Sequence, residues 1–178
     1  GKATSQIPVE ASWHSFFDTI ETFYEKGWTD GLPVVPPTDE NVRAMLATVK
    51  RDPLEVIGPV PPRNGVATVE SVAVNAVMAG CKPEYFKVVL AAVEAMLVES
   101  LNLNGLQATT NAATPLAIVS GPVVKELGIN YGTNLFGHGY RTNATIGRAL
   151  RLVMTVLGGG YPETGDKSPL GQSGKFSF

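Results

Sequence analysis

The chain has 178 residues, a length that suits a single domain. Hydrophobic residues make up 44% of it, charged residues 17%, and the net charge is −2. The chain has no basic block, which argues against a nucleic-acid binder, and it has no run of 18 apolar residues that would predict a membrane span. Because so low a charge leaves little polar surface to cover a large core, we expect part of the apolar surface to be buried against a second protein chain.

Cysteine and histidine are scarce, with one cysteine and two histidines in the chain. A single cysteine excludes an internal disulfide and a cysteine-rich zinc site. The sequence supports neither a metal site nor any particular cofactor. Residues 1–8 lack the basic and then apolar pattern of a secretory signal, so we expect a cytoplasmic protein.

Apolar residues at helical spacing predict five main helices, over residues 13–26, 38–51, 68–79, 83–97 and 143–157, and a short helix over Val123–Leu127. Leu54–Val60 is a candidate strand. The continuous apolar run Pro115–Gly121 predicts a second strand, covered on both faces. These elements predict an α/β or α+β fold, with about five helices around a small sheet and with proline-rich extended segments.

The proline-rich segment Trp28–Pro37 predicts an extended path that lines a cleft or lies over a neighbouring subunit. Asp30, in the turn before the prolines, could hold the turn, bind a cation or orient an arginine. We expect residues 1–160 to form one globular domain. Residues 161–178 have no helical period and end on an alternating strand-like piece. We expect them to form an extended tail that completes a sheet or an interface with another chain.

The stretch Phe136–Thr145 is the first candidate site, because glycines flank His138 and the loop leads directly into a helix. Thr142 or Asn143 could cap that helix. The start of a helix favours anions, so Arg141 and Asn143 are predicted to bind an anionic group and His138 to serve as acid or base. The alternative is a loop that feeds a core helix, with His138 at the surface.

Cys81 is the second candidate, because it lies at or just before a predicted helix start and beside Lys82. Both features lower the pKa of a thiol and favour a nucleophilic or redox role. The alternative is a small buried side chain in the junction between two helices.

Two further groups could bind a polar ligand. Thr110 and Asn111 lie just before the predicted strand Pro115–Gly121, although turn and capping hydrogen bonds are an alternative use. Arg148 and Arg151 lie one turn apart on the last helix and could grip an anion or the carboxylates of a partner. We assign substrate binding to Arg148 among these, and the alternative for both arginines is a solvated face.

Three stretches occur together: GWTDGLPVVPPT from Gly27, NAVMAGCKPEY from Asn75 and RTNATIGRALRL from Arg141. With them, nearly the whole chain resembles a largely uncharacterised bacterial family that is associated with small partner proteins carrying a Sec/Cys-Gly-Ser-Cys motif. The resemblance implies a longer polypeptide that continues past Phe178, with this chain as the N-terminal fragment of a processed precursor. It also implies a second chain as partner, either the C-terminal fragment of that precursor or a separate subunit.

Two functions follow from these patterns. The first is an enzyme subunit for a small anionic or polar substrate, with hydrolytic, C–heteroatom-cleaving or thiol-redox chemistry. In it, Cys81 is the nucleophile, or the partner chain supplies the essential thiol. The second is a non-catalytic assembly subunit of a heteromeric complex. Under the first hypothesis, Cys81, His138 and Arg141 should converge on one pocket.

Overall fold

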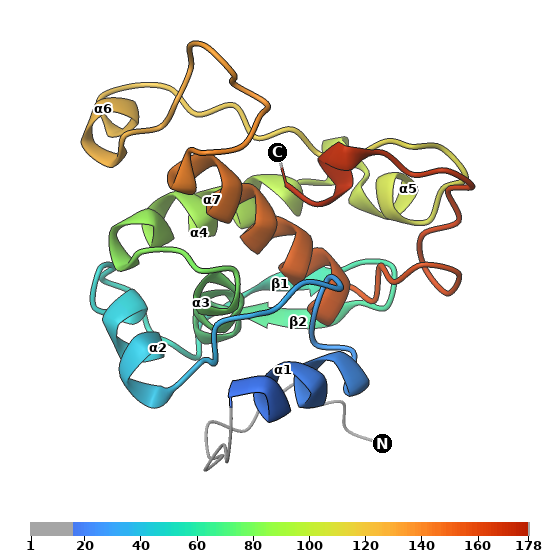
Figure 1. Ribbon diagram of the computed structural model, residues 1–178, viewed down its shortest axis with the longest axis horizontal. Coiled ribbons are helices and arrows are strands. Elements are labelled where there is room, and N and C mark those ends of the chain that lie inside the picture. The colour runs from blue at the N-terminus through green and yellow to red at the C-terminus, as the bar shows by residue number, and fades with distance from the viewer. Residues whose placement is uncertain (1–15, 178) are drawn as a thin grey trace.

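The computed structural model describes residues 16–177, which form a mixed α+β fold. Seven α-helices and one two-stranded antiparallel sheet occur in that range, so the prediction of helices around a small sheet is confirmed (Figure 1). The helices are α1 (Phe16–Glu25), α2 (Asp39–Leu46), α3 (Val69–Met78), α4 (Phe86–Met96), α5 (Leu103–Gln107), α6 (Val123–Leu127) and α7 (Arg141–Leu152). The short helix α5 was not predicted. Residues 13–15 of the first predicted helix lie outside the described range.

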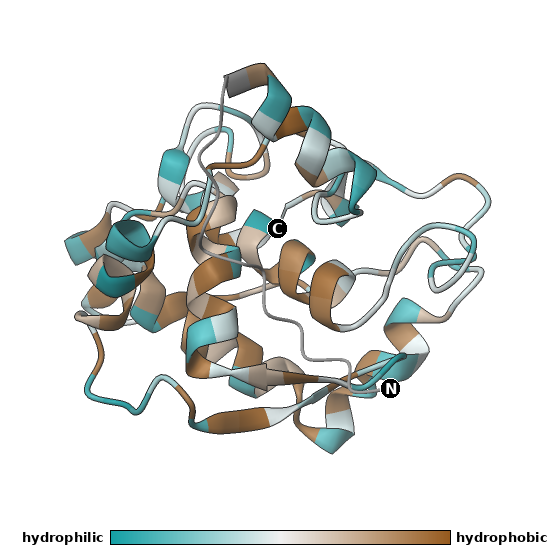
Figure 2. Cartoon of the chain, turned by 90° about the horizontal axis from the view of Figure 1, so that it is seen from below, coloured by the Kyte–Doolittle hydropathy of each residue, from teal (hydrophilic) through white to brown (hydrophobic). Residues whose placement is uncertain are grey.

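Helix α3 is the centre of the core. It packs against α2, α4 and α7, and eight of its residues are buried, from Val69 through Met78. A helix that is apolar all round needs cover on every side. Its start is fixed as the sequence predicts, because the Thr68 hydroxyl accepts from the Ser71 N–H at 3.1 Å and the Ser71 hydroxyl accepts from the Thr68 N–H at 2.8 Å. Figure 2 shows hydrophobic residues concentrated in the central helices.

The sheet is a hairpin of β1 (Val56–Val60) and β2 (Gly65–Thr68), paired from Val60 opposite Gly65 to Val56 opposite Thr68. It packs against the turn Val153–Leu157 at the end of α7. Gly65 is required there, since a Cβ atom on it would lie 2.2 Å from the Leu157 carbonyl oxygen. The hairpin therefore fixes where α7 ends.

The proline-rich segment Trp28–Pro37 crosses the end of α3, where the Val35 N–H donates to the Met78 carbonyl at 3.1 Å. Val34 and Pro37 are buried, and the segment has no helix or strand. Its first half, through Gly31, forms one wall of a cleft described below. The prolines thus follow a path without helix or strand, as predicted, but the cleft is lined by the turn at residues 29–31 and by none of residues 32–37. That the extended part lies over a neighbouring subunit stays a prediction.

The strand predicted over Pro115–Gly121 is wrong. Residues 113–120 have no regular secondary structure, and none of their backbone groups is hydrogen-bonded to another residue in the range 16–177. Ala117 and Val119 pack against the core, whereas Leu116 is 51% exposed and Ile118 is 87% exposed. The apolar run is thus covered on one face instead of two, and no neighbouring strand among the described residues completes a ladder with it.

The tail was expected to be extended, but residues 161–177 fold back onto their own chain. The 3₁₀ turn Ser173–Lys175 lies near α7, where the Ser177 hydroxyl donates to the Ala144 carbonyl at 2.7 Å. The Gln172 amide donates to the Ala112 carbonyl at 3.3 Å. The interface of this tail with another chain stays a prediction.

Among residues 16–177, no helix combines the length and the apolar character that crossing a membrane requires.

Candidate functional site

Two of the predicted site residues meet at the start of α7. The guanidinium of Arg141 donates to the Gly80 carbonyl through Nε at 3.2 Å and Nη2 at 2.9 Å. The thiol of Cys81 donates to the Thr145 carbonyl at 3.3 Å. Arg141 therefore ties the start of α7 to the end of α3, and two of its donors are already used by a backbone carbonyl.

The expected activation of Cys81 is corrected by its surroundings. The residue is 6% exposed, and burial raises the pKa of its thiol to about 11, although the nearby charge of Arg141 acts in the opposite direction. Lys82 does not assist, since its side chain is exposed. A thiol that stays protonated at neutral pH is a poor nucleophile, so the alternative of a buried small side chain describes Cys81 better.

His138 is on the loop 131–140, which is exposed, whereas Cys81 is buried. Its backbone carbonyl accepts from the Asn134 side-chain amide at 2.9 Å. The expected convergence of Cys81, His138 and Arg141 on one pocket is not found, because Cys81 is buried while His138 is exposed, and the cleft described below includes none of the three.

The predicted caps of α7 are also wrong. Tyr140 occupies the cap position and forms no capping bond. Thr142 is buried and donates to the Leu127 carbonyl at 2.9 Å. Asn143 pairs with the backbone of Asn130, accepting at 2.8 Å and donating at 2.9 Å. Both side chains anchor α6 and the exposed loop to α7 and are not available to a ligand.

Thr110 and Asn111 are exposed in a turn where the Asn111 N–H donates to the Thr109 hydroxyl at 3.0 Å. This is the local use that was the alternative to ligand binding. Arg148 is committed to Asp30, to which it donates through Nε at 2.8 Å and Nη2 at 2.9 Å. Of the uses considered for Asp30, the structure shows two: it orients Arg148, and it holds the turn by accepting from the Leu32 N–H at 3.2 Å.

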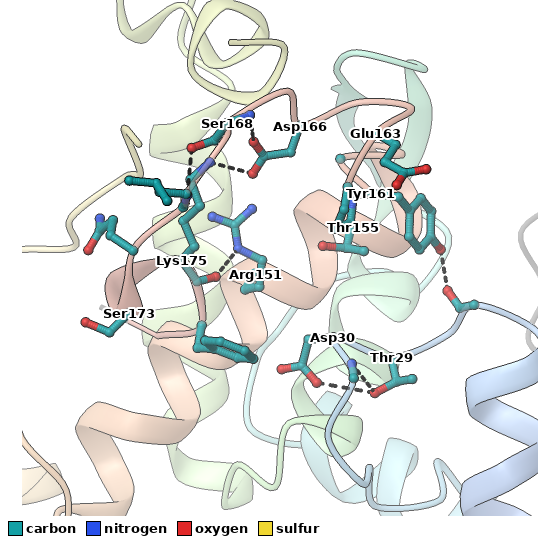
Figure 3. A pocket seen from close by; sticks show the side chains of 18 of the residues that line it. Thr29, Asp30, Arg151, Thr155, Tyr161, Glu163, Asp166, Ser168, Ser173 and Lys175 are labelled. Carbon is teal, nitrogen blue, oxygen red and sulfur yellow. Dashed lines mark hydrogen bonds and ion pairs between the residues drawn. The ribbon is translucent and has the colours of Figure 1, made fainter. Parts of the chain in front are cut away.

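The candidate site that the structure does form is a cleft of about 910 Å³ at the other end of α7 (Figure 3). Its walls are the segment 24–31, the last turns of α7 and the tail residues 160–176. None of the seven predicted site residues lines it, although Arg148 holds one of its walls through Asp30. A cleft of this size is within the range of small-molecule sites.

Irregular backbone shapes the floor of this cleft. Helix α7 ends in a π-helical turn, Val153–Leu157, and such turns occur frequently at functional sites. Gly159 follows with φ of +72°, a conformation that glycine adopts without steric cost. Glu163, which also lines the cleft, has φ of +67°. Because a non-glycine residue in this region is uncommon and strained, it is a reason to look for function here.

Two ion pairs hold the walls of the cleft. Asp30 pairs with Arg148, and the two side chains are 4% and 17% exposed. Asp166 pairs with Lys175, and these side chains are 18% and 13% exposed. Burial by itself raises the pKa of Asp30, but the hydrogen bonds and charge of Arg148 outweigh it and hold that pKa below the ordinary value. Both carboxylates of these pairs are therefore already neutralised.

Arg151 is the cation of the cleft that lacks a carboxylate partner within residues 16–177. It donates through Nε to the Lys175 carbonyl and through Nη2 to the Thr114 hydroxyl at 3.0 Å. Burial lowers the pKa of its guanidinium, while the charges of Asp166 and Asp30 raise it, yet neither forms an ion pair with it. Since a guanidinium has five N–H donors, most of its donor capacity is free for a ligand.

Two hydroxyl groups line the cleft beside Arg151. Thr155 is 5% exposed, and its hydroxyl forms no hydrogen bond to any residue in the described range. It lies one turn beyond Arg151, and Figure 3 shows both side chains facing the same space. The Tyr161 hydroxyl donates to the Gly27 carbonyl, and burial raises its pKa. Tyr161 thereby ties the tail to the segment 24–31, whereas Thr155 is free to contact a ligand.

Comparisons of the chain with protein-family models, with curated proteins and with solved structures find no match. Within residues 16–177, no three His, Cys, Asp or Glu side chains gather closely enough to hold a metal ion. The chemistry of this cleft therefore has to be inferred from its own side chains.

Some features of this site are visible in the sequence. Arg151 was paired with Arg148 as a possible anion grip, but binding was assigned to Arg148, whose charge Asp30 consumes. The Gly158–Gly159–Gly160 run marks the bend, and the Thr29–Asp30–Gly31 turn marks the opposite wall. No periodic pattern in the tail indicates that Asp166 and Lys175 return to α7.

Proposed function

We propose that this chain is the substrate-binding subunit of an enzyme for small anionic molecules and that Arg151 holds the anionic group. The observation that carries the proposal is a half-buried guanidinium without a carboxylate partner among the described residues, facing a cleft of about 910 Å³. Charge-assisted hydrogen bonds from arginine to carboxylate or phosphate are strong and directional. The free hydroxyl of Thr155 supplies a further donor beside it.

The cleft also limits the chemistry. Lys175 pairs with Asp166, and its carbonyl accepts from Arg151 Nε. This contact supports Asp166 and Lys175 as the groups that would exchange a proton with a bound molecule. This suits hydrolysis or C–heteroatom cleavage. Cys81 does not line the cleft, so thiol-redox chemistry would require a thiol from the partner chain.

A titration with butyrate, followed by amide NMR shifts, tests the proposal. We expect saturable shifts at Thr155, Gly160 and Ser173, and a loss of affinity of about 10-fold or more in Arg151→Gln, since a charged hydrogen bond contributes roughly 1.5–3 kcal/mol. Arg43→Gln is the matched control, because Arg43 is exposed and pairs only with Asp39. Arg141→Gln tests whether butyrate binds at the start of α7 instead of at its end. Shifts that centre on Gly80, and that Arg141→Gln removes, would contradict the proposal.

A non-catalytic assembly subunit is the second candidate, and residues 113–120 favour it. Leu116 and Ile118 are exposed while Ala117 and Val119 pack inward, which is the two-residue alternation of a strand. Because its backbone groups have no backbone partner in the range 16–177, a strand of a partner chain could pair with this segment.

Amide hydrogen exchange tests whether residues 113–120 bind a partner chain. Amides 116–120 should exchange rapidly in the isolated chain and become protected in the complex purified from the native cell. Amides of α3 serve as the internal control, because they are buried in both states. Unchanged rapid exchange in the native complex would remove this segment from assembly.

A further inference from the structure

Two of the charged side chains that line the cleft have no ion-pair partner within residues 16–177. The pairs Asp30–Arg148 and Asp166–Lys175 are each neutral. After these pairs, Arg151 and Glu163 are the charged cleft residues without an ion-pair partner in the described range. One free positive charge and one free negative charge thus face the same cleft.

The two free charges occupy different parts of the cleft. Arg151 projects from α7, whereas Glu163 projects from the tail, on the side of Tyr161, and Figure 3 shows them well separated. Thr155 lies between them in that view, and Tyr161 lies beside Glu163. A ligand that contacts both must therefore present its opposite charges at two ends.

The backbone at Glu163 supports a placed carboxylate. Its φ of +67° is unfavourable for a residue with a side chain. The turn is held by hydrogen bonds from the Glu163 N–H to the Asp166 carbonyl at 2.9 Å and from the Asp166 N–H to the Tyr161 carbonyl at 2.8 Å. The turn that strains Glu163 is thus the same turn that positions Asp166 for Lys175.

The carboxylates also determine which anions fit. Glu163 lines the cleft without an ion-pair partner in the described range, whereas Asp30 and Asp166 are each paired with a cation. A second negative group that lies near Glu163 would therefore meet like charge. A second group that is positive would instead approach Glu163. From this arrangement, and resting on the proposed function, we infer that the ligand is a small zwitterion of the amino-carboxylate class, with its carboxylate at Arg151 and its ammonium at Glu163.

Matched pairs of probes test this inference by NMR titration. The pairs are 4-aminobutyrate with butyrate and 6-aminohexanoate with hexanoate, and succinate is the dianion. We expect each amino-carboxylate to bind about two- to fivefold more tightly than its carboxylate, because an exposed ion pair is worth little. The advantage should shrink as salt is added. Succinate should bind no more tightly than butyrate.

Variants test whether Glu163 causes the tighter binding of the amino-carboxylates. Glu163→Gln should make 4-aminobutyrate and butyrate bind equally while butyrate affinity stays as in the wild type. Glu163→Asp keeps the charge and should retain the advantage. Glu40→Gln is the control, since Glu40 is exposed in the first turn of α2, far from the cleft walls. Both positions are exposed, so all three variants should fold.

The outcomes separate the two proposals. If butyrate binds in an Arg151-dependent manner but the amino group adds nothing, or if its advantage survives Glu163→Gln, the zwitterion inference is overturned and the anion site stands. Tighter binding of succinate than of 4-aminobutyrate would also overturn it. If neither butyrate nor 4-aminobutyrate binds, the proposed function and this inference fail together.

Discussion

The two ends of α7 differ in what their arginines contact. At its start, Arg141 donates twice to the Gly80 carbonyl and lies beside the buried thiol of Cys81. Near its end, Arg151 faces a cleft of about 910 Å³ and has no carboxylate partner within residues 16–177. Arg148 lies between them and is paired with Asp30.

The difference comes from segments that are distant in sequence. The end of α3 closes the start of α7, the turn at Asp30 neutralises Arg148, and the returning tail leaves a cleft over Arg151. Three arginines on one helix thus have three uses. Arg141 ties α7 to the end of α3, Arg148 is the wall anchor that holds Asp30, and Arg151 has no carboxylate partner within residues 16–177. An arginine becomes a candidate ligand-binding group only when the fold leaves its charge without a partner.

Removing the wall anchor should have the largest effect. Arg148→Ala leaves the carboxylate of Asp30, whose side chain is 4% exposed, buried without a partner. Breaking one side of a buried pair costs about 3–5 kcal/mol. We expect that decrease in the free energy of unfolding, measured by urea denaturation, together with loss of butyrate binding as the wall loosens.

Arg43→Ala is the matched control for stability. Its partner Asp39 is exposed, with 63% of the side chain accessible, so the change should cost less than about 1 kcal/mol. Adding Asp30→Asn to Arg148→Ala should recover part of the loss, because the neutral amide is cheaper to bury. If Arg148→Ala were as mild as Arg43→Ala, the ion pair would not be holding the wall.

The closed end of α7 makes a smaller but equally specific prediction. Since burial raises the pKa of the Cys81 thiol to about 11, the native protein at about pH 8 holds roughly two-hundred-fold less thiolate than a free thiol would. Alkylation by iodoacetamide should be slower by at least that factor than in the guanidinium-unfolded chain. Mass spectrometry measures the rate in both states.

A native rate within a few-fold of the unfolded rate would contradict this account. It would show that the thiol is accessible and activated, and the start of α7 would again be a candidate functional site. Arg141→Gln sharpens the result, because the charge of Arg141 acts to lower this pKa. Without it, the native rate should fall further.

Local signals predicted most of the helical fold. A helix was predicted from residue 68, and the hydroxyl of Thr68 caps α3 there; α6 spans the predicted Val123–Leu127, and residues 33–37 have neither helix nor strand, as their prolines predict. These features depend on side chains and backbone within a few residues of each other. The run Pro115–Gly121 failed because a strand requires a neighbour, and no described residue supplies one.

The sequence by itself determined the approximate ranges of most helices, which of their faces are apolar and which residues carry charge, because capping, periodicity and backbone constraint act over one or two turns. It also placed two arginines one turn apart near the end of α7. Only the tertiary structure decided that Asp30 pairs with Arg148, that Lys175 pairs with Asp166 and that Arg151 is left over. Charge pairing across more than a hundred residues depends on which segments pack together, and no local pattern records that.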